Sequence, residues 1–207
     1  MQAQAATLVI VGAGGHGRVV ADAALAQQRW ARVVATDRNP ARSVGQLLPG
    51  VPLLPFDEAA ALTGAHVHIA IGAADARERE ARLFGDRLAT VIHPRASVSA
   101  ASTIEAGCFV AAQSVVAPGA RLGMGVIVNH GAVVDHDVEV GAFSHVAPLS
   151  ALGGGVVVGR GVLVGAGAAV LPLRRLADGV VLGAGAVVRV DLVEPGIYAG
   201  VPAQRVR

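Results

Sequence analysis

Several residue types are scarce or absent in this chain, and each absence excludes a class of protein. Aromatic residues make up only 3% of the 207 residues although 53% are hydrophobic, so a packed core must consist of Val, Ala, Leu and Ile. There is no lysine, and the formal net charge is only +2. No basic run carries interleaved aromatic residues, which argues against nucleic acid as a partner.

The chain also has a single cysteine and no long apolar segment. Cys108 falls at a small inward position of the repeat described below, so we expect a buried thiol and no intrachain disulfide. The apolar run Thr7–Val11 is too short for a signal peptide, and no segment of membrane-spanning length lacks glycine or charge. We therefore expect a soluble cytoplasmic protein without membrane insertion.

What the chain has in abundance is an uninterrupted pattern of six residues. Every sixth residue from Ile92 to Val188 is aliphatic, and the residue four further on is small or Val except at Arg174. This period fits neither a helix nor an ordinary strand. It predicts a parallel β-helix of hexapeptides over residues 92–207, with three hexads in each coil, between five and six coils and a short C-terminal tail.

The corners and faces of this predicted prism carry further information. Glycine recurs at the fourth position of the hexad, from Gly107 to Gly185, where a corner needs left-handed backbone. Asp137 takes this position in one hexad, directly after His136. The outer faces are rich in Ala and Val and short of charge, so we expect them to meet other subunits in a homotrimer.

Residues 1–91 instead alternate short apolar runs with helical segments. Strands are expected at Thr7–Val11, 33–36, 66–71 and 89–92, and helices at 18–28, 57–62 and 75–84. This order predicts a small parallel α/β sheet resembling half of a Rossmann domain.

A glycine motif follows the first strand of this sheet. Gly12, Gly14 and Gly17 form G-x-G-x-x-G at the start of the first helix, and Asp37 ends the second strand. Glycines let a phosphate approach helix amides, and the acidic residue can accept ribose hydroxyls. Read literally, the pattern predicts NAD.

The short α/β segment favours a smaller ligand than NAD. It has room for one nucleotide, so we expect a nucleotide or nucleotide sugar; a dinucleotide, or glycines that merely form a tight turn, are the alternatives. The candidate ligand residues lie in the glycine loop and beyond the carboxyl ends of the strands: Gly14, Gly15, His16, Asp37, Arg38 and Gly72.

Three stretches resemble a known family. They are the hexad Val140–His145, the segment VIVGAGGHG at Val9–Gly17 and the segment GIYAGVPA at Gly196–Ala203. Together they resemble bacterial sugar acyltransferases of the sialic acid O-acetyltransferase family, and the resemblance covers essentially the whole chain. It implies a left-handed β-helix, acetyl-CoA as co-substrate and no metal, and the group includes N-acetyltransferases of UDP- or GDP-linked 4-amino sugars.

The resemblance also implies residue roles. His136 would be the general base and Asp137 its modulator; an attacking amine must lose a proton, and a neighbouring carboxylate raises the basicity of histidine. Asn129 would bind the sugar. His145, Ala166 and Ala184 match positions that contact acyl-CoA.

One position departs from the family pattern. Gln204 stands where the family often has lysine, which leaves Arg205 and Arg207 to supply charge for a phosphate.

We expect acetyl-CoA-dependent N-acetylation of a nucleotide-linked 4-amino-deoxy sugar. The alternatives are O-acetylation of sialic acid or another sugar hydroxyl, a non-catalytic nucleotide-binding scaffold, and a zinc enzyme on the same prism that uses its histidines.

Overall fold

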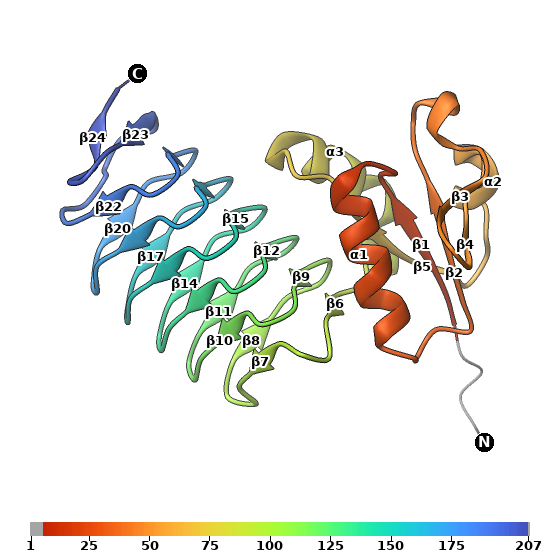
Figure 1. Cartoon of the computed structure of the whole chain (residues 1–207), viewed down its shortest axis with the longest axis horizontal. Coiled ribbons are helices and arrows are strands. Elements are labelled where there is room, and N and C mark those ends of the chain that lie inside the picture. The colour runs from red at the N-terminus through yellow and green to blue at the C-terminus, as the bar shows by residue number, and fades with distance from the viewer. Residues whose placement is uncertain (1–5, 207) are drawn as a thin grey trace. The chain divides into compact units, whose positions relative to one another are not determined.

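The chain forms two compact units, Met1–Pro94 and Arg95–Arg207, where the sequence predicts a boundary between residues 91 and 92. The structure is a computed structural model that describes residues 6–206, and Figure 1 labels its elements. Within those residues no helix is long and apolar enough to cross a membrane.

The first unit is built on a parallel sheet with the strand order β2-β1-β5. Its strands are β1 (Thr7–Val11), β2 (Arg32–Thr36) and β5 (His66–Ile69). Helix α1 (Gly15–Ala26) packs against β1 and β2 and crosses the sheet in Figure 1. The predicted α/β alternation is confirmed, but α1 begins three residues earlier than expected and β5 ends two residues earlier.

Shorter elements complete this unit around the strand ends. The elements are η1 (Pro40–Arg42), the antiparallel pair β3 (Gln46–Leu48) and β4 (Val51–Pro52), α2 (Phe56–Ala60), α3 (Ala74–Phe84), η2 (Gly85–Arg87) and β6 (Val91–Ile92). Arg87 of η2 holds the end of α2 and the loop that follows it, because its guanidinium donates to the carbonyl oxygens of Ala60, Leu62 and Ala65.

The second unit is the predicted left-handed parallel β-helix, with about six turns. Two-residue strands stack in register, each pairing with the strand eighteen residues further on, as Val115 does with Val133. The aliphatic residue of each strand points inward and is buried from β9 to β22, whereas Val98 and Ile104 in the first coil are half-buried; Cys108 is buried, as predicted. Figure 1 shows the coils as a regular stack.

The strands form three sheets, which we name by a central strand. The β13 sheet contains β7 (Ser97–Val98), β10 (Val115–Val116), β13 (Val133–Val134), β16 (Ala151–Leu152), β19 (Ala169–Val170) and β22 (Val187–Val188). The β14 sheet contains β8 (Thr103–Ile104), β11 (Arg121–Leu122), β14 (Glu139–Val140), β17 (Val157–Val158) and β20 (Arg175–Leu176). The β15 sheet contains β9 (Phe109–Val110), β12 (Ile127–Val128), β15 (His145–Val146), β18 (Leu163–Val164), β21 (Val181–Leu182), β23 (Ile197–Ala199) and the antiparallel β24 (Gln204–Arg205).

The three faces differ in polarity. The outward residue of each strand is polar or charged along most of the β14 sheet, where Arg121 and Glu139 form an exposed ion pair. On the β13 sheet the outward residues are mainly Val and Ala, and on the β15 sheet they are mainly large and apolar, with His145 the exception. Two faces are thus apolar and one is hydrophilic.

The fourth hexad position forms left-handed corners, as predicted. Its glycines have positive φ, among them Gly119 (75°) and Gly155 (66°). Five residues with side chains adopt the same conformation at this position: Gln113, Asp137, Phe143, Leu149 and Leu173.

Candidate functional site

His136 and Asp137 occupy the corner between β13 and β14. The φ of Asp137 is 58°, and its Oδ2 accepts a hydrogen bond of 3.0 Å from His136 Nδ1. A carboxylate only accepts, so the imidazole proton is on Nδ1 and the lone pair of Nε2 is available to a substrate. The sequence-predicted base and modulator are therefore in direct contact.

Electrostatics favour a basic imidazole at this corner. The hydrogen bond to Asp137 and, after it, the charge of Asp135 raise the pKa of His136 above its ordinary value. The backbone N–H of His136 donates to Asp135 Oδ1 at 2.7 Å, which fixes the turn. The side chains of His136 and Asp137 are 63% and 73% exposed, so the base is open to a ligand.

Two glycines in the adjacent coils leave room for this pair. A Cβ on Gly154, eighteen residues after His136, would collide with the imidazole at Nε2. A Cβ on Gly119, eighteen residues before Asp137, would collide with the carboxylate at Oδ1. Gly154 was not predicted from the sequence, because it does not occupy the fourth hexad position. Its separation of eighteen residues from His136, one full coil, could have identified it.

Asn129 and His145 form a second polar pair. Asn129 Oδ1 accepts from the backbone N–H of His130 at 2.9 Å, which orients the amide so that Nδ2 faces His145 Nε2 at 3.1 Å. Asn129 lies at the corner between β12 and β13, whereas His136 lies at the corner after β13. A single chain therefore places the two pairs on different edges of the prism.

Ala166 and Ala184 lie on the same edge as Asn129, in later coils, and both are exposed. At the C-terminal end of the prism is a hollow of about 360 Å³ lined by Arg189, Val190, Pro202, Ala203 and Gln204; its Arg189 and Val190 follow β22 and so lie on the edge that carries His136. Of the two predicted phosphate ligands, Arg205 is paired with Glu194 Oε2 at 2.6 Å, and Arg207 lies outside the described residues.

A pocket of about 390 Å³ lies at the glycine loop of the first unit, beyond the carboxyl ends of the strands. It brings together all six ligand residues predicted for this unit, with Arg42 in addition. Gly14 is the N-cap of α1, and neither Gly14 nor Gly15 has a neighbour within 4 Å of a built Cβ. This open backbone gives a phosphate access to the amides at the start of α1.

The other two glycines of the motif serve close packing. Gly12 has φ of 115°, and a Cβ there would lie 2.7 Å from the carbonyl oxygen of Ala70. A Cβ on Gly17 would collide with the carbonyl oxygen of Gly12. The motif therefore divides into packing glycines and ligand-facing glycines.

Asp37 stabilises the backbone around the pocket through two hydrogen bonds. Its Oδ2 accepts from the backbone N–H of Ala13, and its Oδ1 accepts from that of Asn39, both at 2.9 Å. Asp37 thereby ties the glycine loop to the segment after β2.

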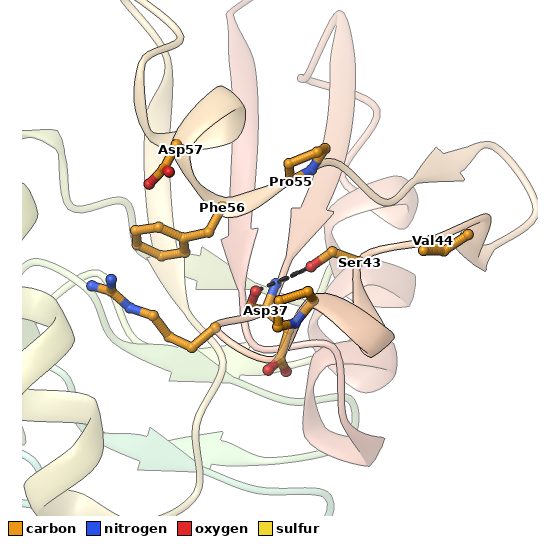
Figure 2. A pocket seen from close by; sticks show the side chains of 8 residues that line it. Asp37, Ser43, Val44, Pro55, Phe56 and Asp57 are labelled. Atoms are coloured by element: carbon orange, nitrogen blue, oxygen red, sulfur yellow. Dashed lines mark hydrogen bonds between the residues drawn. The ribbon is translucent and has the colours of Figure 1, made fainter.

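A second pocket, of about 400 Å³, adjoins the first through Asp37 and Arg38. Figure 2 shows it between the Asp37–Val44 segment and the start of α2, with the bond from Asp37 N–H to Ser43 Oγ drawn at its base. The guanidinium of Arg38 stacks 3.6 Å above the ring of Phe56 and makes a two-pronged bond to Glu80, with both distances 3.0 Å. Arg38 is thus held in place as part of the wall. Phe56 and Glu80 escaped sequence reasoning because they come from two later elements.

The remaining polar groups offer no metal centre: within residues 6–206, no cluster of three or more His, Cys, Asp or Glu side chains could hold a metal ion.

The chain is similar to one family model and to several solved structures. Residues 7–83 match the family model of the PglD N-terminal domain. The acetyltransferase domain of PglB from Neisseria gonorrhoeae FA1090, solved with acetyl coenzyme A, is 34% identical over 98% of this chain and 100% of that one, with a TM-score of 0.90. PerB from Caulobacter crescentus, solved with CoA and GDP-perosamine, is 34% identical over 99% of each chain, with a TM-score of 0.89.

A more distant structure supports the fold alone: WeeI from Acinetobacter baumannii AYE is 18% identical over 97% of this chain, with a TM-score of 0.64. No curated protein matches the chain.

The fold and these similarities define a β-helix acyltransferase. More particularly, the chain belongs to the hexapeptide-repeat acetyltransferase family that includes the PglB acetyltransferase domain and PerB.

Proposed function

We propose that the protein is an acetyl-CoA-dependent N-acetyltransferase that acts on a nucleotide-linked 4-amino-deoxy sugar. The observation that carries the proposal is the His136–Asp137 corner, with Nε2 open and the imidazole pKa raised. The family supports it, since perosamine N-acetyltransferase from Caulobacter crescentus was solved with CoA and GDP-perosamine.

The reaction needs one base and no metal. The sugar amine attacks the thioester carbonyl carbon directly, forming the C–N bond, while His136 Nε2 takes the proton that the amine loses. The C–S bond then breaks, CoA leaves as a thiolate, and the proton on His136 can return to it. Asp137 stabilises the imidazolium through its bond to Nδ1.

We assign the nucleotide to the first unit. Gly14, Gly15 and His16 would hold the diphosphate at the start of α1, and Asp37, Arg38 and Gly72 would enclose the nucleoside. We add Arg42, because it lines the same pocket and, among the described residues, its side chain makes no ion pair or hydrogen bond.

We assign acetyl-CoA to the edge that carries Asn129, Ala166 and Ala184. The C-terminal hollow lies instead on the edge that carries His136, because Val190 comes three coils of eighteen residues after it; at about 4.8 Å per coil the two are roughly 14 Å apart along the prism. Pantetheine spans about 12 bonds, or roughly 15 Å when extended. With its thioester between His136 of one copy and His145 of another, it would bring the phosphates toward Arg189 of the copy that supplies His136, near Gln204.

We propose that the active enzyme is a homotrimer. The two apolar faces, on the β13 and β15 sheets, would pack between copies and leave the charged β14 face in solvent. Such packing would let His136 of one copy face the Asn129–His145 pair of another.

Because acetyl-CoA and nucleotide sugars are cytoplasmic metabolites, we propose that the enzyme works in the cytoplasm.

The test is CoA thiol release from acetyl-CoA with a panel of UDP- and GDP-linked 4-amino sugars, with the matching 4-hydroxy sugars and free sialic acid as controls. We expect release with at least one amino sugar, a mass gain of one acetyl group on nitrogen, and none with the 4-hydroxy partner. Release with sialic acid and with no amine would replace the proposal by O-acetylation.

A further inference from the structure

Arg77 is a fully buried arginine behind the pocket of the glycine loop. It lies in the first turns of α3, and the residue is only 1% exposed. One of its terminal nitrogens, Nη1, donates to the carbonyl oxygens of Ile71 and Gly72, each at 2.7 Å. Ile71 and Gly72 both line the pocket.

Burying a guanidinium is costly, so its position calls for an explanation beyond packing. His68, also fully buried, does not share the charge: burial and the nearby Arg77 lower its pKa to about 4, so it is neutral near pH 7. Arginine itself stays protonated, so a positive charge lies beneath the pocket wall.

This arrangement has two consequences for an anion. The carbonyl oxygens of Ile71 and Gly72 are engaged by Arg77, so their lone pairs are drawn away from a ligand phosphate that they would otherwise repel. The charge also acts through a poorly polarisable interior, where its attraction for an anion is screened less than at the surface.

We propose that Arg77 is a positioning residue for the diphosphate of the nucleotide ligand: it orients the Ile71–Gly72 wall and supplies positive potential behind it. This inference rests on the proposed function. Arg77 acts through the wall and does not touch the substrate.

The test uses the full-length protein and separates charge from shape. GDP, guanosine, UDP and uridine are titrated calorimetrically into wild type, Arg77→Lys and Arg77→Gln, because glutamine keeps N–H donors but has no charge. We expect the ratio of diphosphate to nucleoside affinity to fall three- to tenfold in Arg77→Lys, whose charge is retracted on a shorter stem, and at least tenfold in Arg77→Gln. Nucleoside affinities should change less than threefold.

Arg82→Gln is the matched control, because it removes an exposed charge from the same helix and should leave the ratio unchanged. A ratio unchanged in Arg77→Lys and Arg77→Gln, or an equal loss of nucleoside and diphosphate affinity, overturns the proposal. If Arg77→Gln does not fold, Arg77→Lys decides alone, and an unchanged ratio overturns it.

If wild type binds neither GDP nor UDP, the proposed nucleotide function fails together with this inference. If wild type binds a diphosphate and the ratios do not move, only the role of Arg77 fails.

Discussion

The two units of this protein position their functional groups in opposite ways. In the β-helix, each residue stacks on the residue eighteen positions away, so one offset determines nearly every neighbour. In the α/β unit, one pocket collects residues from the ends of three strands and from an intervening turn, at positions between 11 and 72. The repeat provides a rigid frame, whereas the α/β unit provides a concave pocket.

The difference explains where chemistry is found in each unit. In the β-helix it lies where one coil departs from its neighbours: the corner that holds His136 and Asp137 is followed, one coil later, by Gly154 and Gly155. In the α/β unit it lies where the regular strands stop. Five substitutions test this contrast.

The largest effect should come from His136→Ala. Removal of the general base should lower kcat about 10²–10⁴-fold while the β-helix remains folded, since the side chain is exposed. Acetyl transfer and circular dichroism measure the two effects. His130→Ala is the matched control, because His130 is exposed at the same hexad position of the preceding corner. An equal loss of kcat in His136→Ala and His130→Ala would contradict the assignment of His136 as the general base.

Gly17→Ala should disrupt the α/β unit and spare the β-helix. The new methyl group would collide with the carbonyl oxygen of Gly12, at a cost of about 1–3 kcal/mol or more. The single tryptophan, Trp30, lies in the α/β unit, so its fluorescence during urea unfolding reports on this unit. Gly15→Ala is the control, because nothing lies within 4 Å of its Cβ. Equal stability of the two variants would contradict the packing role of Gly17.

The β-helix can be predicted from the sequence in more detail than the α/β unit, for the same reason. The hexads predict the coils, the buried ladder and the left-handed corners, because each depends only on residues a fixed number of positions apart. They also single out Asp137 as a side chain at a glycine position. The contact between Asn129 and His145 was within reach too, since the two residues are sixteen apart on neighbouring coils.

Other features depend on how separate elements pack, and no local pattern encodes them. Arg38 lines the pocket as expected, but the sequence does not show that Phe56 of α2 and Glu80 of α3 hold its guanidinium. In the sequence, Arg77 resembles the other arginines of a polar helix, and only the structure shows that it is buried. Helix α1 begins at Gly15 because the glycine loop enters helical geometry directly, although glycine has a low helix propensity.

His68→Asn should change how the stability of the α/β unit depends on pH. The pKa of buried His68 is lowered from 6.5 to about 4, so the unfolded state gains a proton that the folded state refuses, and stability is lost as pH falls between these values. The loss should reach about 3 kcal/mol in wild type. Asn can still donate to Ala89 O, which accepts from His68 Nδ1, but does not titrate. The free energy of unfolding is measured at each pH by urea unfolding detected through Trp30 fluorescence. If it changes with pH in the same way in wild type and variant, His68 is not the group that titrates.

Gly154→Ala tests the room beside the base. Alanine occupies the same hexad position at Ala166 and Ala184, so the backbone should accept it, but the methyl group would displace the imidazole of His136. We expect kcat to fall about 10–100-fold with little change in melting temperature. Adding the substitution to His136→Ala should cost nothing further. An additional loss in the double variant would mean that Gly154 acts independently of His136.

The central proposal is that the carboxylate of Asp137, at a corner position usually held by glycine, raises the basicity of His136. The direct measurement is the pH profile of kcat/KM for wild type and Asp137→Asn; asparagine tolerates the left-handed backbone and still accepts the Nδ1 hydrogen bond. His136 must be neutral to accept a proton, and Asp137 raises its pKa, so the acidic limb in wild type should lie above the ordinary pKa of histidine. We predict that the limb moves to lower pH in Asp137→Asn and that the plateau falls about tenfold. An acidic limb at the same pH in both proteins would contradict the account.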